Sequence, residues 1–306
     1  MSRGIYLVAN RISEEHCLNL ITSLRRTGCT LPIRLIPFGG APVSARGILD
    51  QVTVMPPEAF PAEGLAFINE LATVLTCPRG FLLRFLSFFG DWDEFIYSDN
   101  DIVGLMDWSE LFIYLEPPLA SGPVDLVHAD QEFLTNGKFN YRQPASITDT
   151  FGAQAMDSLL TAGHYLARRD PRLVADLSQA LDWMRTHQQE VILHDQTLMH
   201  LAVLLGGWRT RNLCREPIPW GSSWAGDYPD ALSLIQATNG TPRKRISHVH
   251  YSGGWPDGTK PVDVLLLSHL ARDAYNRRIM VDTARHCTGY NSVRSLIKRA
   301  KRKLKR

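Results

Sequence analysis

The sequence predicts an α/β domain whose central sheet is mostly parallel and flanked by helices. The chain has 306 residues, of which 44% are hydrophobic and 21% charged, and strand and helix patterns alternate along its first third. This composition excludes wholly disordered, collagen-like and coiled-coil proteins. The length allows one large domain or two modest ones. No apolar run reaches the roughly 20 residues that a membrane-spanning helix needs.

The first elements are expected in the order strand, helix, strand, strand. Ile5–Ala9 is a short apolar run, and residues 33–38 and 52–55 are similar runs closed by glycine or proline. Ser13 precedes two glutamates and apolar residues at helical spacing, which predicts a helix that stops at Gly28. Elements in this order are typical of a parallel sheet with crossover helices.

The later elements are less regular. Residues 94–98 and 124–128 are expected to be strands, and apolar spacing predicts a helical middle from about 153 to 205. Residues 206–230, rich in Trp, Gly and Pro, indicate an ordered loop region, and 246–251 should form a last strand.

Cysteine usage and the N-terminus indicate a cytoplasmic protein. The five cysteines are scattered, odd in number and never in CxxC spacing, so neither a disulfide framework nor a cysteine zinc site is expected. The apolar start at residues 4–9 is too short for a signal peptide and is expected to be a strand.

Two carboxylates follow one apolar strand. The strand at 94–98 runs directly into Asp99 and Asp101, with Asn100 between them. Ligands of open α/β sheets bind at the carboxyl ends of strands, and alternate residues of an extended segment point the same way. The pair could therefore hold Mn²⁺, with Mg²⁺ as the other candidate. A polar turn after a strand is the alternative interpretation.

A second candidate site follows the last strand. His248 and His250 lie on one face of an extended segment, before the turn at Gly253 and before Lys260. Imidazole can complete a metal shell begun by carboxylates, glycine lets backbone amides approach phosphates, and lysine neutralises their charge. Only one histidine need be a ligand, and two histidines on an exposed strand are the alternative.

Together the two motifs resemble the retaining glycosyltransferase family 8, which has the GT-A fold. That family carries an arginine on a helix, a strand of the type YLDxD, and a closing HxxGxxKPW. The matching residues here are Arg84, Tyr97–Asp101, His250–Gly253 and Lys260–Pro261. The glycine-to-lysine interval is longer than in the family, and Val262 stands where tryptophan would follow. The resemblance is confined to motifs over residues 4–262, which suggests a divergent relative.

The resemblance implies a set of roles. It implies that Asp99, Asp101 and His250 bind Mn²⁺ and that Lys260 faces the diphosphate of a UDP-sugar donor. It places Arg84 near the nucleotide, and Ala9 and Asn10 near the base. The residues implied to contact the metal or the donor are Ala9, Asn10, Arg84, Asp99, Asn100, Asp101, His250, Gly253 and Lys260.

A third motif, Asp195-Gln196, falls between the other two, in family order. In the family such a pair opens a helix beside the sugar. The resemblance implies that Asp195 binds donor-sugar hydroxyls and that Gln196 stabilises positive charge at the anomeric carbon. Helix capping is the alternative for both residues. The nearest candidate for the family's middle FNxG motif is Phe151–Ala153.

Two further segments carry candidate binding functions. Trp220 and Trp224 could stack on an acceptor sugar, or they could pack in the core. Residues 294–306 hold eight basic residues and no acidic one, around an apolar stripe. This pattern predicts a basic amphipathic helix drawn to an anionic membrane surface. A solvated helix end is the alternative, and nothing else in the chain supports nucleic-acid binding.

The resemblance implies a GT-A catalytic domain over residues 1–262, and the helical pattern after Pro261 predicts a helical extension over 263–306. The expected activity is metal-assisted transfer of a hexose from a UDP-sugar, with retention of configuration. The acceptor, whether saccharide, lipid-linked or protein, is not indicated. The alternatives are a catalytically weak nucleotide-sugar-binding protein and a nucleotidyltransferase. A cytoplasmic enzyme is expected, peripheral at the inner face of the membrane if the tail binds lipid.

Overall fold

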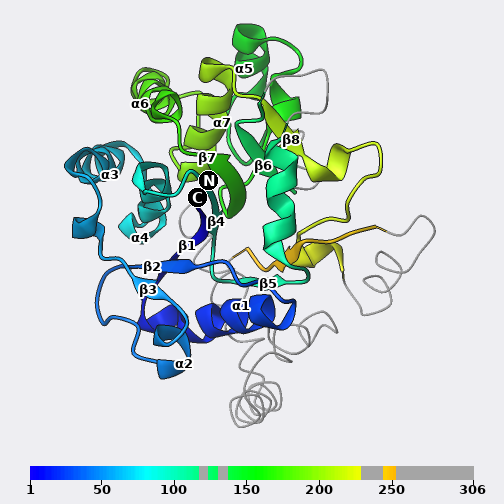
Figure 1. Ribbon diagram of the computed structural model, residues 1–306. Helices are drawn as coiled ribbons and strands as arrows, with labels where there is room; N and C mark the ends of the chain where they lie inside the picture. The colour runs from blue at the N-terminus through cyan, green and yellow to red at the C-terminus, as the bar shows by residue number, and fades with distance from the viewer. Residues whose placement is uncertain (117–122, 130–136, 229–243, 253–306) are drawn as a thin grey trace, which may run out of the picture.

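The computed structural model describes residues 1–116, 123–129, 137–228 and 244–252. A seven-stranded sheet in the order β3-β2-β1-β4-β7-β6-β8 forms its centre (Figure 1). The strands are β1 (Arg3–Ala9), β2 (Ile33–Pro37), β3 (Thr53–Val54), β4 (Glu94–Ser98), β6 (Leu126–His128), β7 (His164–Arg168) and β8 (Thr210–Asn212). The first four strands in this order run parallel, β7 is antiparallel to both of its neighbours, and β8 is parallel to β6. The prediction of a mostly parallel sheet is therefore confirmed.

Two hydrophobic clusters cover the two faces of the sheet. Successive residues of β1 belong to different clusters: Ile5 and Leu7 pack into one, Tyr6 and Val8 into the other. A strand buried on both faces has a nearly continuous apolar sequence. For this reason the predicted bounds of β1 and β4 agree closely with the observed ones.

Helices contribute many of the other members of both clusters. In the view of Figure 1, α1 and α2 lie below the sheet, and α3, α6 and α7 lie above it. Helix α1 ends just before Gly28, whose φ of 89° is the left-handed conformation expected of a helix stop. The helices are α1 (Glu14–Arg26), α2 (Arg46–Leu49), α3 (Ala62–Val74), α4 (Arg79–Leu82), α5 (Pro144–Phe151), α6 (Pro171–Thr186) and α7 (Asp195–Gly206).

The prediction of a helical middle over 153–205 is wrong in part. Helices α6 and α7 lie there, but so does β7, which pairs with β4 and is almost completely buried. Leucines near β7 repeat at a spacing that also fits a helix, and a short apolar run does not distinguish the two.

A small second sheet places the last strand beside the carboxylate motif. Strand β5 (Ile102–Gly104) pairs antiparallel with β9 (His248–His250), and Ile102 lies opposite His250. The segment after β4 is thereby joined to a part of the chain about 150 residues away.

Several predictions lie outside the described residues. They concern Gly253, Lys260, the domain boundary at 262 and the helical extension with its basic tail. Among the residues that the structure describes, no helix has both the length and the apolar character needed to cross a membrane.

Candidate active site

A pocket of about 480 Å³ lies at the carboxyl ends of β1 and β4. One part of its wall is charged and is formed by the residues after β4, by the start of α7 and by the end of β9. Another part is apolar and includes Val8, Ile12, Phe38 and Phe81. The pocket therefore lies where open α/β sheets bind their ligands.

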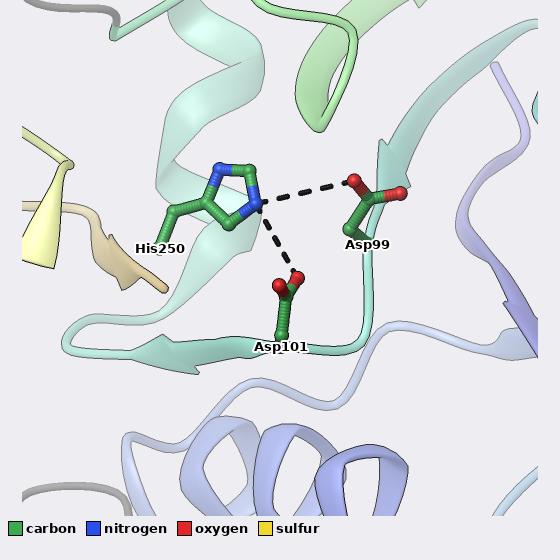
Figure 2. A group of neighbouring side chains, drawn as sticks. All are labelled: Asp99, Asp101 and His250. Carbon is green, nitrogen blue, oxygen red and sulfur yellow. Dashed lines mark ion pairs between the residues drawn. The ribbon is translucent and has the colours of Figure 1, made fainter. Parts of the chain in front are cut away.

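Asp99, Asp101 and His250 converge at the charged part of this pocket (Figure 2). One ligand atom from each residue lies within 4.8 Å of the others. His250 Nε2 is 3.3 Å from Asp101 Oδ1 and 3.9 Å from Asp99 Oδ2. Two carboxylates and one imidazole are a donor set that suits Mn²⁺, so the residues fit the metal that the sequence predicts.

Backbone hydrogen bonds hold the three residues in place. The Asp99 amide donates to Gly163 O at 2.6 Å, and the Tyr251 amide donates to Asp101 O at 3.0 Å. The His250 amide donates to Ser223 O at 2.6 Å. Burial raises the pKa of Asp99, and the neighbouring Arg84 cation opposes this rise.

Gly163 lies beside these three residues, where there is no room for a larger side chain. A Cβ at this position would overlap the His250 ring and would lie 3.0 Å from Asp99 Oδ2. We expect Gly163→Ala to displace His250 and to weaken Mn²⁺ binding about tenfold or more, since misoriented ligands bind metal poorly. Calorimetric titration with Mn²⁺ measures this loss.

Gly47→Ala is the matched control. Gly47 lies on α2, and a methyl group there would meet only the Leu18 side chain, at 3.3 Å. This variant should bind Mn²⁺ as the wild type does. Unchanged Mn²⁺ affinity in Gly163→Ala would show that Mn²⁺ binding does not depend on the present position of the His250 ring.

His248 lies away from the pocket. Its ring centroid is 4.0 Å from that of His164, and its Nδ1 shares a 2.8 Å hydrogen bond with Ser247 Oγ. Burial, helped by nearby His164 and His250, lowers the pKa of His248 well below its usual value. Of the two histidines that the sequence offered, the structure therefore brings His250 to the carboxylates and packs His248 in the interior.

His250→Ala should weaken Mn²⁺ and UDP binding about 10–100-fold because it removes a ligand atom. His248→Ala should leave Mn²⁺ affinity nearly unchanged and should lower thermal stability, since it opens a cavity in the interior. Calorimetry with Mn²⁺ and UDP, paired with thermal unfolding, separates the two effects. An equal or reversed ranking of affinities would assign the ligand to His248.

Arg84 forms ion pairs with both Asp99 and Asp195, and so connects the carboxylate pair after β4 to the start of α7. It lies on the 3₁₀ helix Leu83–Phe89 and is 4% exposed. Its Nη1 is 2.9 Å from Asp195 Oδ2, and its Nη2 is 3.2 Å from Asp99 Oδ1. Burial alone would lower the pKa of Arg84, but Asp195 and Asp99 raise it above its usual value. One buried cation therefore holds two carboxylates of the pocket wall.

Asp195 and Gln196 both line the pocket. Their contacts with a donor sugar stay a prediction. The two residues open α7, but the helix is capped by His194, whose Nδ1 accepts from the Thr197 amide at 3.1 Å. The capping that was the alternative role for the pair is thus performed by the residue before it. Gln196 Nε2 donates to Asn140 Oδ1 at 2.9 Å.

Ala9 and Asn10 do not line the pocket described here. Ala9 is completely buried in a hydrophobic cluster, and Asn10 Oδ1 accepts from the Ile12 and Ser13 amides at 3.0 and 3.2 Å. Their contact with a base stays a prediction. Asn100 does line the pocket, and its Nδ2 donates to Val8 O at 3.0 Å, which ties the ends of β1 and β4 together.

The structure corrects the choice of Phe151–Ala153 for the middle motif. Phe151 closes α5 and packs on Trp183, with 5.8 Å between ring centroids, and the pocket wall does not include it. Thr161–Gly163, just before β7, lines the pocket instead. The sequence does not identify this segment because it does not predict β7, the strand that the segment precedes. The signal in the sequence is a small residue and a glycine directly before a short apolar run.

The two tryptophans of the 206–230 region have different surroundings. Trp220 is 5% exposed, with the Tyr114 ring edge and the Arg245 guanidinium against it, so core packing is the correct alternative for it. Trp224 is half-buried, forms an isolated bridge with His250, and is not part of the pocket wall.

No protein-family model and no curated protein sequence matches the chain. Solved structures do match. The apo structure of the WbbM bifunctional glycosyltransferase has a TM-score of 0.60 at 15% identity, covering 90% of this chain and 51% of that one. This chain thus spans about half the length of WbbM.

Two smaller glycosyltransferases match over nearly their whole length. Galactosyltransferase LgtC, in complex with donor and acceptor sugar analogs, has a TM-score of 0.54 at 14% identity, covering 90% of this chain and 99% of that one. Mouse xyloside xylosyltransferase 1 has a TM-score of 0.52 at 11% identity, covering 83% and 98%. With its mostly parallel sheet flanked by helices, the chain has the GT-A glycosyltransferase fold, in agreement with its family 8 resemblance.

Proposed function

We propose that this chain is a metal-dependent glycosyltransferase that moves a hexose from a UDP-sugar to an acceptor, with retention of configuration. One observation carries the proposal: a two-carboxylate, one-imidazole group is joined through Arg84 to Asp195 in a single pocket. In this arrangement a metal held by Asp99, Asp101 and His250 would lie next to polar groups suited to a sugar. LgtC, a galactosyltransferase of the same fold, was solved with donor and acceptor sugar analogs, which supports a sugar donor.

The charged and polar residues of the pocket would have different roles in the reaction. Asp99, Asp101 and His250 would hold Mn²⁺ or Mg²⁺, which would supply positive charge for the diphosphate leaving group. Asp195, held by Arg84 through one oxygen, keeps its other oxygen to accept hydrogen bonds from sugar hydroxyls. The carboxamide of Gln196 would face the anomeric carbon, where an amide oxygen stabilises developing positive charge.

Retention is what the family 8 resemblance implies, and the residues at the start of α7 fit it. Gln196 cannot take a proton, and Asp195 is already paired with a buried guanidinium. We expect the product to keep the anomeric configuration of the donor. Proton NMR of the anomeric coupling constant reports it, and an inverted product would make Asp195 the candidate base.

A screen of sugar nucleotides tests the function directly. With Mn²⁺ present, we expect slow release of UDP from at least one UDP-hexose, and EDTA should abolish it. Release of inorganic pyrophosphate in place of UDP would indicate a nucleotidyltransferase. Binding of UDP-sugars without turnover, with or without added saccharides, would indicate a nucleotide-sugar-binding protein. Either result would contradict the proposal.

The acceptor can be a saccharide, a lipid-linked sugar or a protein. The basic stretch at 293–306 lies outside the described residues, and its role at an anionic membrane surface stays part of the proposal. A lipid-linked acceptor would suit such a placement because it would keep the pocket close to the membrane surface.

A further inference from the structure

The carboxamide of Gln196 is held by a buried side chain behind the pocket wall. Gln196 Nε2 donates to Asn140 Oδ1 at 2.9 Å, and Asn140 Nδ2 lies 3.4 Å from the backbone oxygen of Gln196. Asn140 is only 1% exposed and does not line the pocket. Asn140 therefore does not contact a ligand in the pocket directly, and its side chain reaches the pocket wall through Gln196.

Asn140 is itself fixed by its backbone. Its amide donates to Gly137 O at 3.0 Å, and its carbonyl accepts from the Ile192 amide at 2.8 Å. The same carbonyl accepts from Thr197 Oγ1, in the first turn of α7, at 3.0 Å. These bonds set the position of the Asn140 side chain relative to the start of α7. A buried side chain with its hydrogen bonds made has one preferred orientation.

The orientation of a carboxamide decides which charge it presents. Its nitrogen and oxygen diverge from the trigonal carbonyl carbon in different directions, so a nitrogen held by Asn140 directs Oε1 away from that hydrogen bond. We propose that Asn140 is a positioning residue that fixes the Gln196 carboxamide with its oxygen toward the donor sugar; this inference rests on the proposed function. The amide oxygen carries partial negative charge, whereas the NH₂ group would oppose positive charge at the anomeric carbon. Without Asn140 the amide would populate both orientations.

Asn140→Leu keeps a similar volume and removes both side-chain hydrogen bonds. We expect kcat for donor hydrolysis to fall about tenfold, the effect of one well-placed hydrogen bond, with the donor KM within twofold of wild type. Asn140→Asp keeps an acceptor oxygen for Gln196 Nε2 and should restore most of the lost kcat. A loss that falls on KM alone, or an unchanged kcat in Asn140→Leu, would overturn the proposal.

Tyr141→Phe controls for a general loosening of the same segment. It removes the 2.6 Å hydrogen bond between the Tyr141 hydroxyl and His200 Nδ1 on α7, and it leaves Gln196 untouched. Its kcat should stay within twofold of wild type. In a Gln196→Ala background, Asn140→Leu should have no further effect on kcat. Additive losses in the two variants would show that Asn140 acts only on the fold.

A measurement independent of turnover separates this inference from the proposed function. The side-chain amide signals of Gln196 are identified in ¹⁵N NMR spectra by their absence in Gln196→Ala. In the wild type the two protons should have well-separated shifts, and in Asn140→Leu they should move toward those of a free amide. An unchanged pair would overturn the role of Asn140 even in an active enzyme. The expected shift in a protein that turns over no sugar nucleotide would support the contact while the proposed function fails.

Discussion

Replacing Asp101 by alanine is expected to reduce sugar transfer about 1000-fold or more while the protein stays folded. The side chain offers one of the three candidate metal-ligand atoms that converge in the pocket. Metal-based charge stabilisation is worth several kcal/mol in the transition state, and each 1.4 kcal/mol is about tenfold in rate. Asp99→Ala should be equally inactive. UDP release with Mn²⁺ at saturating donor measures both.

Stability distinguishes loss of the metal from loss of the fold. Asp99 and Asp101 repel each other when no metal lies between them, so metal-free Asp101→Ala should be at least as stable as metal-free wild type. Added Mn²⁺ and UDP should raise the Tm of the wild type only, because a ligand stabilises the state that binds it. Asp182→Ala, at a carboxylate 72% exposed on α6, is the matched control and should keep full activity. Near-normal turnover in Asp101→Ala would refute the metal assignment.

Arg84→Lys is expected to have the second largest effect, on both stability and turnover. Two separate guanidinium nitrogens of Arg84 meet Asp99 and Asp195, whereas lysine has one ammonium nitrogen and lacks the rigid planar geometry that spans both carboxylates. We expect a loss of about 2 kcal/mol in the free energy of unfolding, and a larger one of about 3–5 kcal/mol in Arg84→Ala, which leaves the carboxylates without their cation. Turnover should fall about 100-fold or more in both variants. Urea unfolding and UDP release measure the two effects.

Arg185→Lys is the matched control for Arg84. Arg185 is 37% exposed and pairs with Asp182 one helical turn away. Exposed ion pairs contribute little, so this exchange should change stability by less than about 0.5 kcal/mol. If Arg84→Lys behaved in the same way, the guanidinium would not be what holds the two carboxylates together.

The sequence predicts those parts of the fold that depend on local patterns. Strands β1 and β4 are buried on both faces, so they appear as continuous apolar runs. Asp99 and Asp101 are recognisable because they follow such a run, at the edge where ligands bind. Strand β7 is not recognisable, since its apolar run is short and leucines beside it fit a helical period.

The remaining site features depend on contacts that no local pattern contains. The choice between His248 and His250 is made by the pairing of β9 with β5, which sets His250 opposite Ile102. Gly163 matters because a Cβ there would overlap His250, and Asn140 matters because it hydrogen-bonds to Gln196, 56 residues away. These partners are distant in sequence, and only the tertiary fold brings them together.

The central claim is that Asp99, Asp101 and His250 bind a divalent metal that in turn binds a nucleoside diphosphate. Titration of Mn²⁺ followed by electron paramagnetic resonance tests this claim most directly, because protein-bound Mn²⁺ loses the sharp signal of the free ion. We predict saturable binding to wild type that UDP tightens about tenfold or more, and the loss of both effects in Asp101→Ala. A free-ion signal unchanged by wild-type protein and UDP, or equal binding by Asp101→Ala, would contradict it.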